Sequence, residues 1–170
     1  MQKFYEIQFP QKEGEIFLSP LISYDAKKLK TGEFTPTEVF DVKISEGNKF
    51  YDILRFQDPF NFAISEKVLS ILKENSISGW KEFVISIEGN EYKYYALQVL
   101  GRCGKLIKPK DKGFIIGLKF DITTWDNSDF FCPEETLTIF CTEKVRDLFV
   151  INKITNIEFV EINKAEWFNS

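Results

Sequence analysis

Ser65-Glu66-Lys67-Val68 opens the stretch that decides the fold, because the same pattern returns 77 residues later as Thr142-Glu143-Lys144-Val145. In both copies a hydroxyl residue occupies the expected N-cap position of a helix, and a glutamate follows in the first turn. Apolar residues then recur at helical spacing until an asparagine near each expected helix end. The two stretches therefore predict two similar helix–strand units that pack on one sheet.

Alternating apolar residues around these helices predict β-strands. The expected strands cover residues 3–9, 39–44, 51–56, 83–87, 92–100, 114–120, 137–141 and 157–162. Gly89-Asn90 separates two of them and has the residues of a tight hairpin turn. The run 114–120 is strongly apolar, and we expect it to be buried. Together these patterns predict a single α+β domain with a mostly antiparallel or mixed sheet and two main helices.

A polar turn near residue 48 divides the chain into two expected regions. Residues 1–48 are expected to form an extended N-terminal arm or subdomain. Residues 49–170 are expected to form the main α+β domain, which contains both helical stretches.

The composition excludes several classes of protein. With 170 residues, of which 44% are hydrophobic, the chain is long enough to bury a core. Histidine is absent, which excludes Ser-His-Asp triads and metal sites that contain histidine. The three cysteines have no CxxC spacing and are expected to be buried free thiols. The N-terminus lacks the apolar segment of a signal peptide, and no run reaches the roughly 18 apolar residues of a membrane span. We therefore expect a cytoplasmic protein without a membrane partner.

The charge distribution argues against nucleic acid as the partner. The net charge is −4, whereas nucleic-acid-binding domains usually carry a basic surface. Residues 49–113 carry 11 basic and 8 acidic groups, and residues 114–170 carry 5 basic and 10 acidic groups. The last third of the chain is therefore distinctly acidic.

No catalytic constellation is evident in the sequence. Ser78 and Lys81 have the spacing of a serine hydrolase motif, but its companion motifs are missing. Asp121, Asp126 and Asp129 are close in sequence, but they lack the turn glycine and bidentate glutamate of a calcium loop. We expect no enzymatic turnover, no cofactor and no metal. A small enzyme that uses these carboxylates is the alternative.

The stretch Asp121 to Glu135 combines five carboxylates with three large aromatic residues and has no basic residue. Protein interfaces use aromatic side chains as buried anchors and charges to set orientation and association rate. The predicted partner-binding residues comprise two anchors, Trp125 and Phe130, and four acids expected to face a basic patch, Asp126, Asp129, Glu134 and Glu135. In the other interpretation, the aromatic side chains turn inward and the acids solvate the surface.

Several motifs, in this order along the chain, resemble a known family. They are Asp58-Pro59-Phe60 before the first helix, Tyr94-Tyr95-Ala96-Leu97-Gln98-Val99, Thr124-Trp125-Asp126-Asn127-Ser128, the helix opened by Thr142, and Ile154-Thr155-Asn156-Ile157-Glu158-Phe159. Over about residues 50–162 this order resembles immunity protein family eleven of the bacterial polymorphic toxin systems.

The resemblance implies a cytoplasmic antidote that binds and blocks a cognate secreted toxin by stoichiometric protein–protein inhibition. It implies no catalytic residues, and it does not specify an oligomeric state. A non-catalytic adaptor protein without a toxin partner is a further alternative. The reading frame beside the gene would discriminate between them, because an immunity gene accompanies a large secreted protein with a variable C-terminal domain.

Overall fold

The computed structural model describes residues 2–59, 61–107, 113–134 and 136–169. The helices are α1 (Ala26–Thr31), α2 (Glu66–Glu74), α3 (Glu143–Ile151) and the short 3-10 helix η1 (Ile122–Thr124). The strands are β1 (Phe4–Gln8), β2 (Phe17–Pro20), β3 (Phe40–Glu46), β4 (Ile53–Phe56), β5 (Phe62–Ser65), β6 (Trp80–Ile87), β7 (Tyr94–Val99), β8 (Gly101–Lys105), β9 (Gly113–Ile116), β10 (Phe130–Glu134), β11 (Phe140–Thr142), β12 (Glu158–Glu161) and β13 (Glu166–Asn169). The predicted α+β class is confirmed.

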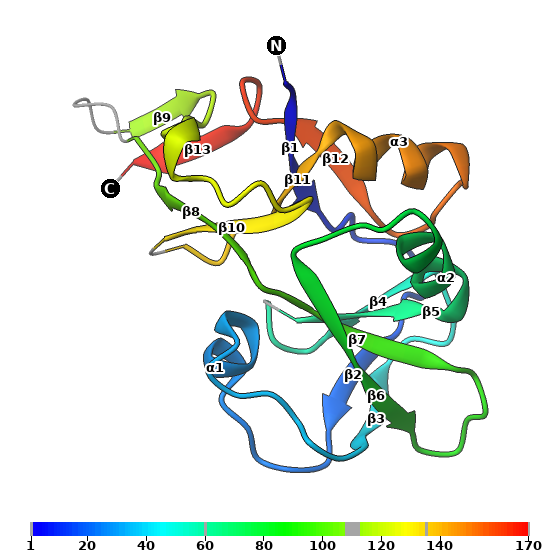
Figure 1. Cartoon of the computed structure of the whole chain (residues 1–170). Coiled ribbons are helices and arrows are strands. Elements are labelled where there is room, and N and C mark those ends of the chain that lie inside the picture. The colour runs from blue at the N-terminus through cyan, green and yellow to red at the C-terminus, as the bar shows by residue number, and fades with distance from the viewer. Residues whose placement is uncertain (1, 60, 108–112, 135, 170) are drawn as a thin grey trace.

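The strands form two larger sheets, one in each half of the molecule (Figure 1). The barrel half is the closed barrel β2-β3-β6-β7-β5-β4 together with α1 and α2. The sheet half is the five-stranded sheet β12-β1-β11-β10-β8 together with α3. The chain passes from the sheet half to the barrel half between β1 and β2, and it returns where β7 leads into β8 (Figure 1). A separate two-stranded ribbon pairs β9 with β13 at one edge of the sheet half.

The two halves are built from the same supersecondary unit, and they exchange a strand. In the barrel half β7 lies between β5 and β6, and in the sheet half β1 lies between β11 and β12. The registers agree residue by residue: Ala63 is opposite Ala96 in the barrel, and Phe140 is opposite Glu6 in the sheet. Strand β1, which precedes β5 in the chain, therefore completes the unit of β11, α3 and β12. Strand β7, which precedes β11, completes the unit of β5, α2 and β6. The 77-residue repeat in the sequence is thus a structural repeat.

The two main helices occupy equivalent places, but on different sheets. Helix α2 packs on β5 and β7 of the barrel, and α3 packs on β11 and β1 of the five-stranded sheet. The prediction of both helices is confirmed, whereas the prediction that they share one sheet is wrong. Each helix ends alike, because the side-chain amide of Asn75 donates to the Ile71 carbonyl and that of Asn152 donates to the Leu148 carbonyl, both at 2.8 Å.

The two N-caps differ from each other. The Ser65 hydroxyl accepts a hydrogen bond from the backbone N–H of Val68 at 3.4 Å, as the cap requires. Thr142 has the extended backbone of a cap, but its hydroxyl accepts nothing from the helix. It donates instead to the Asp129 carboxylate at 2.9 Å. The prediction of a capping hydrogen bond at Thr142 is therefore wrong.

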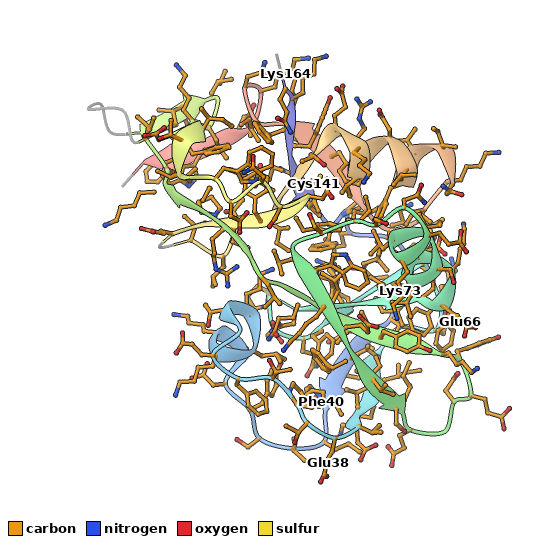
Figure 2. The ribbon with its side chains drawn as sticks, viewed as in Figure 1. Glu38, Phe40, Glu66, Lys73, Cys141 and Lys164 are labelled. Carbon is orange, nitrogen blue, oxygen red and sulfur yellow. The ribbon has the colours of Figure 1, made fainter. Side chains whose placement is uncertain are left out.

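The apolar core of the described residues has three parts, which follow the repeat. The central core lies between the halves and takes side chains from α2 and α3, including Val68, Leu72, Val145 and Phe149. The barrel core fills the barrel around Phe40, and the outer core lies in the sheet half around Phe131 and Phe140. Figure 2 shows Phe40 inside the barrel half and Cys141, a central-core residue, inside the sheet half.

The first 48 residues belong to both halves. Strand β1 pairs with β11 and β12 in the sheet half, and β2 and β3 are barrel strands. Ile7 is part of the central core, and Leu18 and Val42 are part of the barrel core. The expected arm, residues 1–48, is therefore corrected: the described part of this region contributes to the central, barrel and outer cores and does not extend from the 49–170 region.

Candidate functional site

The acidic stretch 121–134 is ordered by backbone contacts to β8. Thr124 Oγ1 accepts a hydrogen bond from Gly104 N at 2.7 Å, and a carboxylate oxygen of Asp126 accepts one from Arg102 N at 2.8 Å. Hydrogen bonds from the Thr123 hydroxyl and backbone N–H hold the pKa of Asp121 below its ordinary value. The stretch then enters β10, which lies between β8 and β11. The stretch is therefore irregular, apart from η1, only as far as Asp129 and continues as a strand from Phe130.

Phe130 is a core residue. Its side chain is only 1% exposed and packs in the central core, where its ring is 6.4 Å from that of Phe149. The residue begins β10 opposite Cys141, so its side chain points to the helix side of the sheet. A partner cannot reach this ring in the folded protein, and the prediction of a surface anchor at Phe130 is corrected. For this residue the inward interpretation holds.

Trp125 is partly buried and covers the outer core. Its ring centroid is 5.0 Å from that of Phe4 and 5.5 Å from that of Phe131. Its indole N–H donates to the Ser128 carbonyl at 3.1 Å, which closes the turn that precedes β10. The residue as a whole is partly exposed. Trp125 therefore has a structural role, and its replacement would affect the fold as well as any binding to a partner.

Asp129 joins the two repeats. Its carboxylate accepts hydrogen bonds from Ser78 N at 3.0 Å, from Ser78 Oγ at 3.2 Å and from Thr142 Oγ1 at 2.9 Å. The Lys144 ammonium is 4.0 Å away. Because Ser78 follows the helix of the first repeat and Thr142 precedes the helix of the second, one carboxylate connects both helices.

Asp52 makes the equivalent contacts with the two repeats interchanged, because it bonds to the residue before α2 and to a residue that follows α3. Its carboxylate accepts from Thr155 N and Thr155 Oγ1, both at 2.9 Å, and from Ser65 Oγ at 3.2 Å. The Lys67 ammonium is 3.8 Å away. Asp52 precedes Asp129 by 77 residues, so the pair follows the repeat. The position of Asp129 is thus explained by the fold, and its expected role toward a partner receives no support from this geometry.

The remaining predicted acids differ in exposure. Asp126 is exposed, and besides Arg102 N it accepts a hydrogen bond from Ser128 N at 3.0 Å. Glu134 is exposed at the end of β10. Glu135 lies outside the described residues. The structure therefore leaves Asp126 and Glu134, with the accessible part of Trp125, at the surface of the sheet half.

The described side chains offer little reactive chemistry. Cys103, Cys132 and Cys141 are free and buried, as predicted, and burial raises the pKa of each thiol, that of Cys103 to about 12. A thiol that stays protonated at neutral pH is a poor nucleophile. Within the described ranges, no three His, Cys, Asp or Glu residues form a cluster that could hold a metal ion.

None of the helices that the structure describes combines the length and the apolar character needed to span a membrane.

The ribbon carries the most exposed aromatic side chain of the described chain. Phe114 is 85% exposed, Ile116 is 76% exposed and Phe168 is 57% exposed. Phe114 is directly opposite Phe168 in the register, and Ile116 is opposite Glu166, so these side chains share one face. The two phenyl rings pack edge to face, with their centroids 5.3 Å apart. We call Phe114, Ile116 and Phe168 the ribbon face.

The opposite side of the ribbon is packed on the protein. Trp167 lies against the outer core, as Trp125 does. The ribbon face is therefore the outward side of an element that is anchored on the same core as the acidic stretch. An apolar cluster of this kind, held on a covered strand pair, is typical of a binding surface.

Sequence reasoning missed the ribbon face because the run 114–120 was expected to be buried throughout. The structure has β9 only to Ile116, and Gly117 then turns the chain with φ +90°. In the structure Phe114 and Ile116 point to solvent and Ile115 is less exposed. The apolar run alone does not indicate which face of the strand is buried. The flanking Gly113 and Gly117 were the available signal, because two glycines at left-handed φ isolate a short strand.

No protein-family model matches this chain, and no curated protein shows significant similarity to it. The resemblance to the immunity proteins therefore stays a prediction.

Proposed function

We propose that this protein is a stoichiometric, non-catalytic inhibitor of a partner protein, and that the partner is a toxin domain encoded beside it. The observation that carries the proposal is the ribbon face, which presents two phenylalanine rings and an isoleucine side chain to solvent. Exposed apolar side chains gathered on one face favour association with another protein. The resemblance in sequence supplies the class of partner.

The ribbon face has the features of an interface centre. Aromatic anchors contribute most when they are rigid before binding, because little side-chain entropy is then lost. Phe114 and Phe168 support each other across the strand pair, and the backbone of the ribbon is fixed by antiparallel pairing. A complementary pocket on the partner would bury both rings.

The last third of the chain, which holds the three residues of the ribbon face, is acidic. Residues 114–170 have a net charge of −5, and Glu166 shares the ribbon face. Asp126 and Glu134 extend the acidic surface over the same half of the molecule. This arrangement favours a partner with a basic surface, because complementary charge speeds association. A toxin domain that acts on nucleic acid would offer such a surface.

The experiment that tests the proposal is co-expression with the C-terminal domain encoded by the adjacent reading frame. We expect that domain alone to arrest growth, and co-expression of this protein to restore growth at equal expression levels. The Ile116→Ser variant is expected to lose most of the protection, because a polar side chain replaces one of the three apolar groups at the interface centre.

Ile151→Ser is the matched control. Ile151 lies at the end of α3 and is also 76% exposed, so the same change is made at the same exposure away from the ribbon. It should protect as well as the wild type. Failure of the wild-type protein to restore growth would refute the toxin partner. Equal protection by both variants would place the interface elsewhere.

A further inference from the structure

A cavity of about 170 Å³ lies where α1 of the barrel half meets β8 and β10 of the sheet half. Its walls include Lys30, Thr31, Arg102, Cys132, Glu134 and Thr136. This volume is large enough for several water molecules or a small ligand. None of the described lining residues of the cavity belongs to the ribbon or to helices α2 and α3 of the repeat.

Lys30 is the unusual residue of this cavity. Its side chain is buried, with the residue only 3% exposed, and its ammonium nitrogen has no hydrogen-bond partner among the described residues. The ring of Phe62 is centred 6.0 Å from this nitrogen. Burial lowers the pKa of Lys30 to about 8, so the group is still mostly protonated at neutral pH. A buried, unpaired ammonium is costly, which makes an anion in the cavity favourable.

Arg102 adds a second positive charge at the same place. Its guanidinium donates to the carbonyls of Val99, Gly101 and Thr31, at 3.0, 2.8 and 2.7 Å. These contacts fix the guanidinium but do not neutralise it, because carbonyl groups carry no net charge. Within the described residues no carboxylate forms an ion pair with Arg102 or Lys30.

The other groups at the cavity fit the same kind of ligand. Burial raises the pKa of Cys132, so its thiol is neutral and can act as a weak donor. Thr31 and Thr136 also line the cavity, and their hydroxyl groups donate within the protein, to the Glu33 carboxylate at 2.9 Å and to the Pro133 carbonyl at 3.4 Å. Among the described lining residues Glu134 is the one carboxylate, and it is exposed to solvent.

We propose that this cavity is a binding site for a small oxyanion, a phosphate or a carboxylate, held by the Lys30 ammonium and the Arg102 guanidinium. The ligand would lie between α1 and β10 and so would connect the two halves. Glu134 at the wall weakens the site by like-charge repulsion, and the cavity volume limits the site to small ligands.

The test titrates the purified full-length protein with inorganic phosphate and, separately, with acetate, by calorimetry at constant ionic strength. We expect wild-type protein to bind at least one of the two with a dissociation constant of about 1 mM or tighter. The two titrations distinguish a phosphate site from a carboxylate site. Lys30→Met should weaken binding by at least about tenfold, since one of two charges is lost. Methionine fills the same volume without a charge, so the variant should stay folded.

Two further variants make the result specific. Lys28→Met removes an exposed lysine from the same helix and should leave the dissociation constant within about twofold of the wild type. Glu134→Gln should tighten binding severalfold. Absence of binding for both anions would overturn the proposal, and so would a Lys30→Met variant that binds as the wild type does. Neither result would bear on the ribbon face.

Discussion

Gly79→Ala is expected to lower the free energy of unfolding by about 4 kcal/mol or more. The residue has φ +85°, where a side chain is strained, and a Cβ atom would lie 2.1 Å from the carbonyl oxygen of Phe130 and 2.6 Å from Ser128 Cβ. The Gly79 carbonyl also accepts hydrogen bonds from Leu100 N and Gly101 N, so the backbone cannot move away freely. Urea denaturation followed by circular dichroism measures the change.

Gly89→Ala is the control for this prediction. Gly89 lies at the hairpin turn and has a similar φ of +70°, but no atom lies within 4 Å of the place that a Cβ atom would occupy there. Its replacement should cost only about 1 kcal/mol, which is the backbone strain alone. Equal costs at the two glycines would mean that the close approach of the repeats at Phe130 is not present.

Asp129→Ala is expected to cost about 3 kcal/mol of unfolding free energy. The change leaves two donors of Ser78 and the hydroxyl of Thr142 without their charged acceptor, and hydrogen bonds to charged groups are the stronger kind. The carboxylate is therefore a structural group, because it connects both repeats.

Asp52→Ala should have nearly the same cost, because Asp52 makes the equivalent contacts to Thr155 and Ser65. Asp121→Ala is the control. Asp121 is fully exposed and accepts only from its neighbour Thr123, so its removal should change stability little. Chemical denaturation of the three variants would contradict this explanation if Asp121→Ala cost as much as the other two.

The sequence predicted the local units of the fold because their signals are local. The caps and apolar spacing indicated α2 and α3, and Gly89-Asn90 indicated the β6–β7 hairpin. The strand exchange was not predicted, because pairing between β1 and β11 joins residues that are more than 130 positions apart. A further similarity marks it in retrospect: Phe4-Tyr5 and Gln8 recur as Tyr94-Tyr95 and Gln98, 90 residues later.

The candidate site was predicted only in part. The acidic stretch was singled out by its composition, but composition does not say which way a strand faces. Phe130 points into the central core, whereas Phe114 on the ribbon points to solvent. The partner of β9 is β13 near the C-terminus, and nothing in the run around Phe114 indicates that pairing.

Calorimetric titration of the purified protein with the domain encoded by the adjacent reading frame tests the proposed inhibition most directly. We predict a one-to-one complex that Phe114→Ser weakens by about 2 kcal/mol, or roughly 30-fold, because the ring is an interface anchor. Ile151→Ser should leave the affinity unchanged, and circular dichroism should show both variants folded. Absence of a complex, or wild-type affinity in a folded Phe114→Ser variant, would contradict binding through the ribbon face.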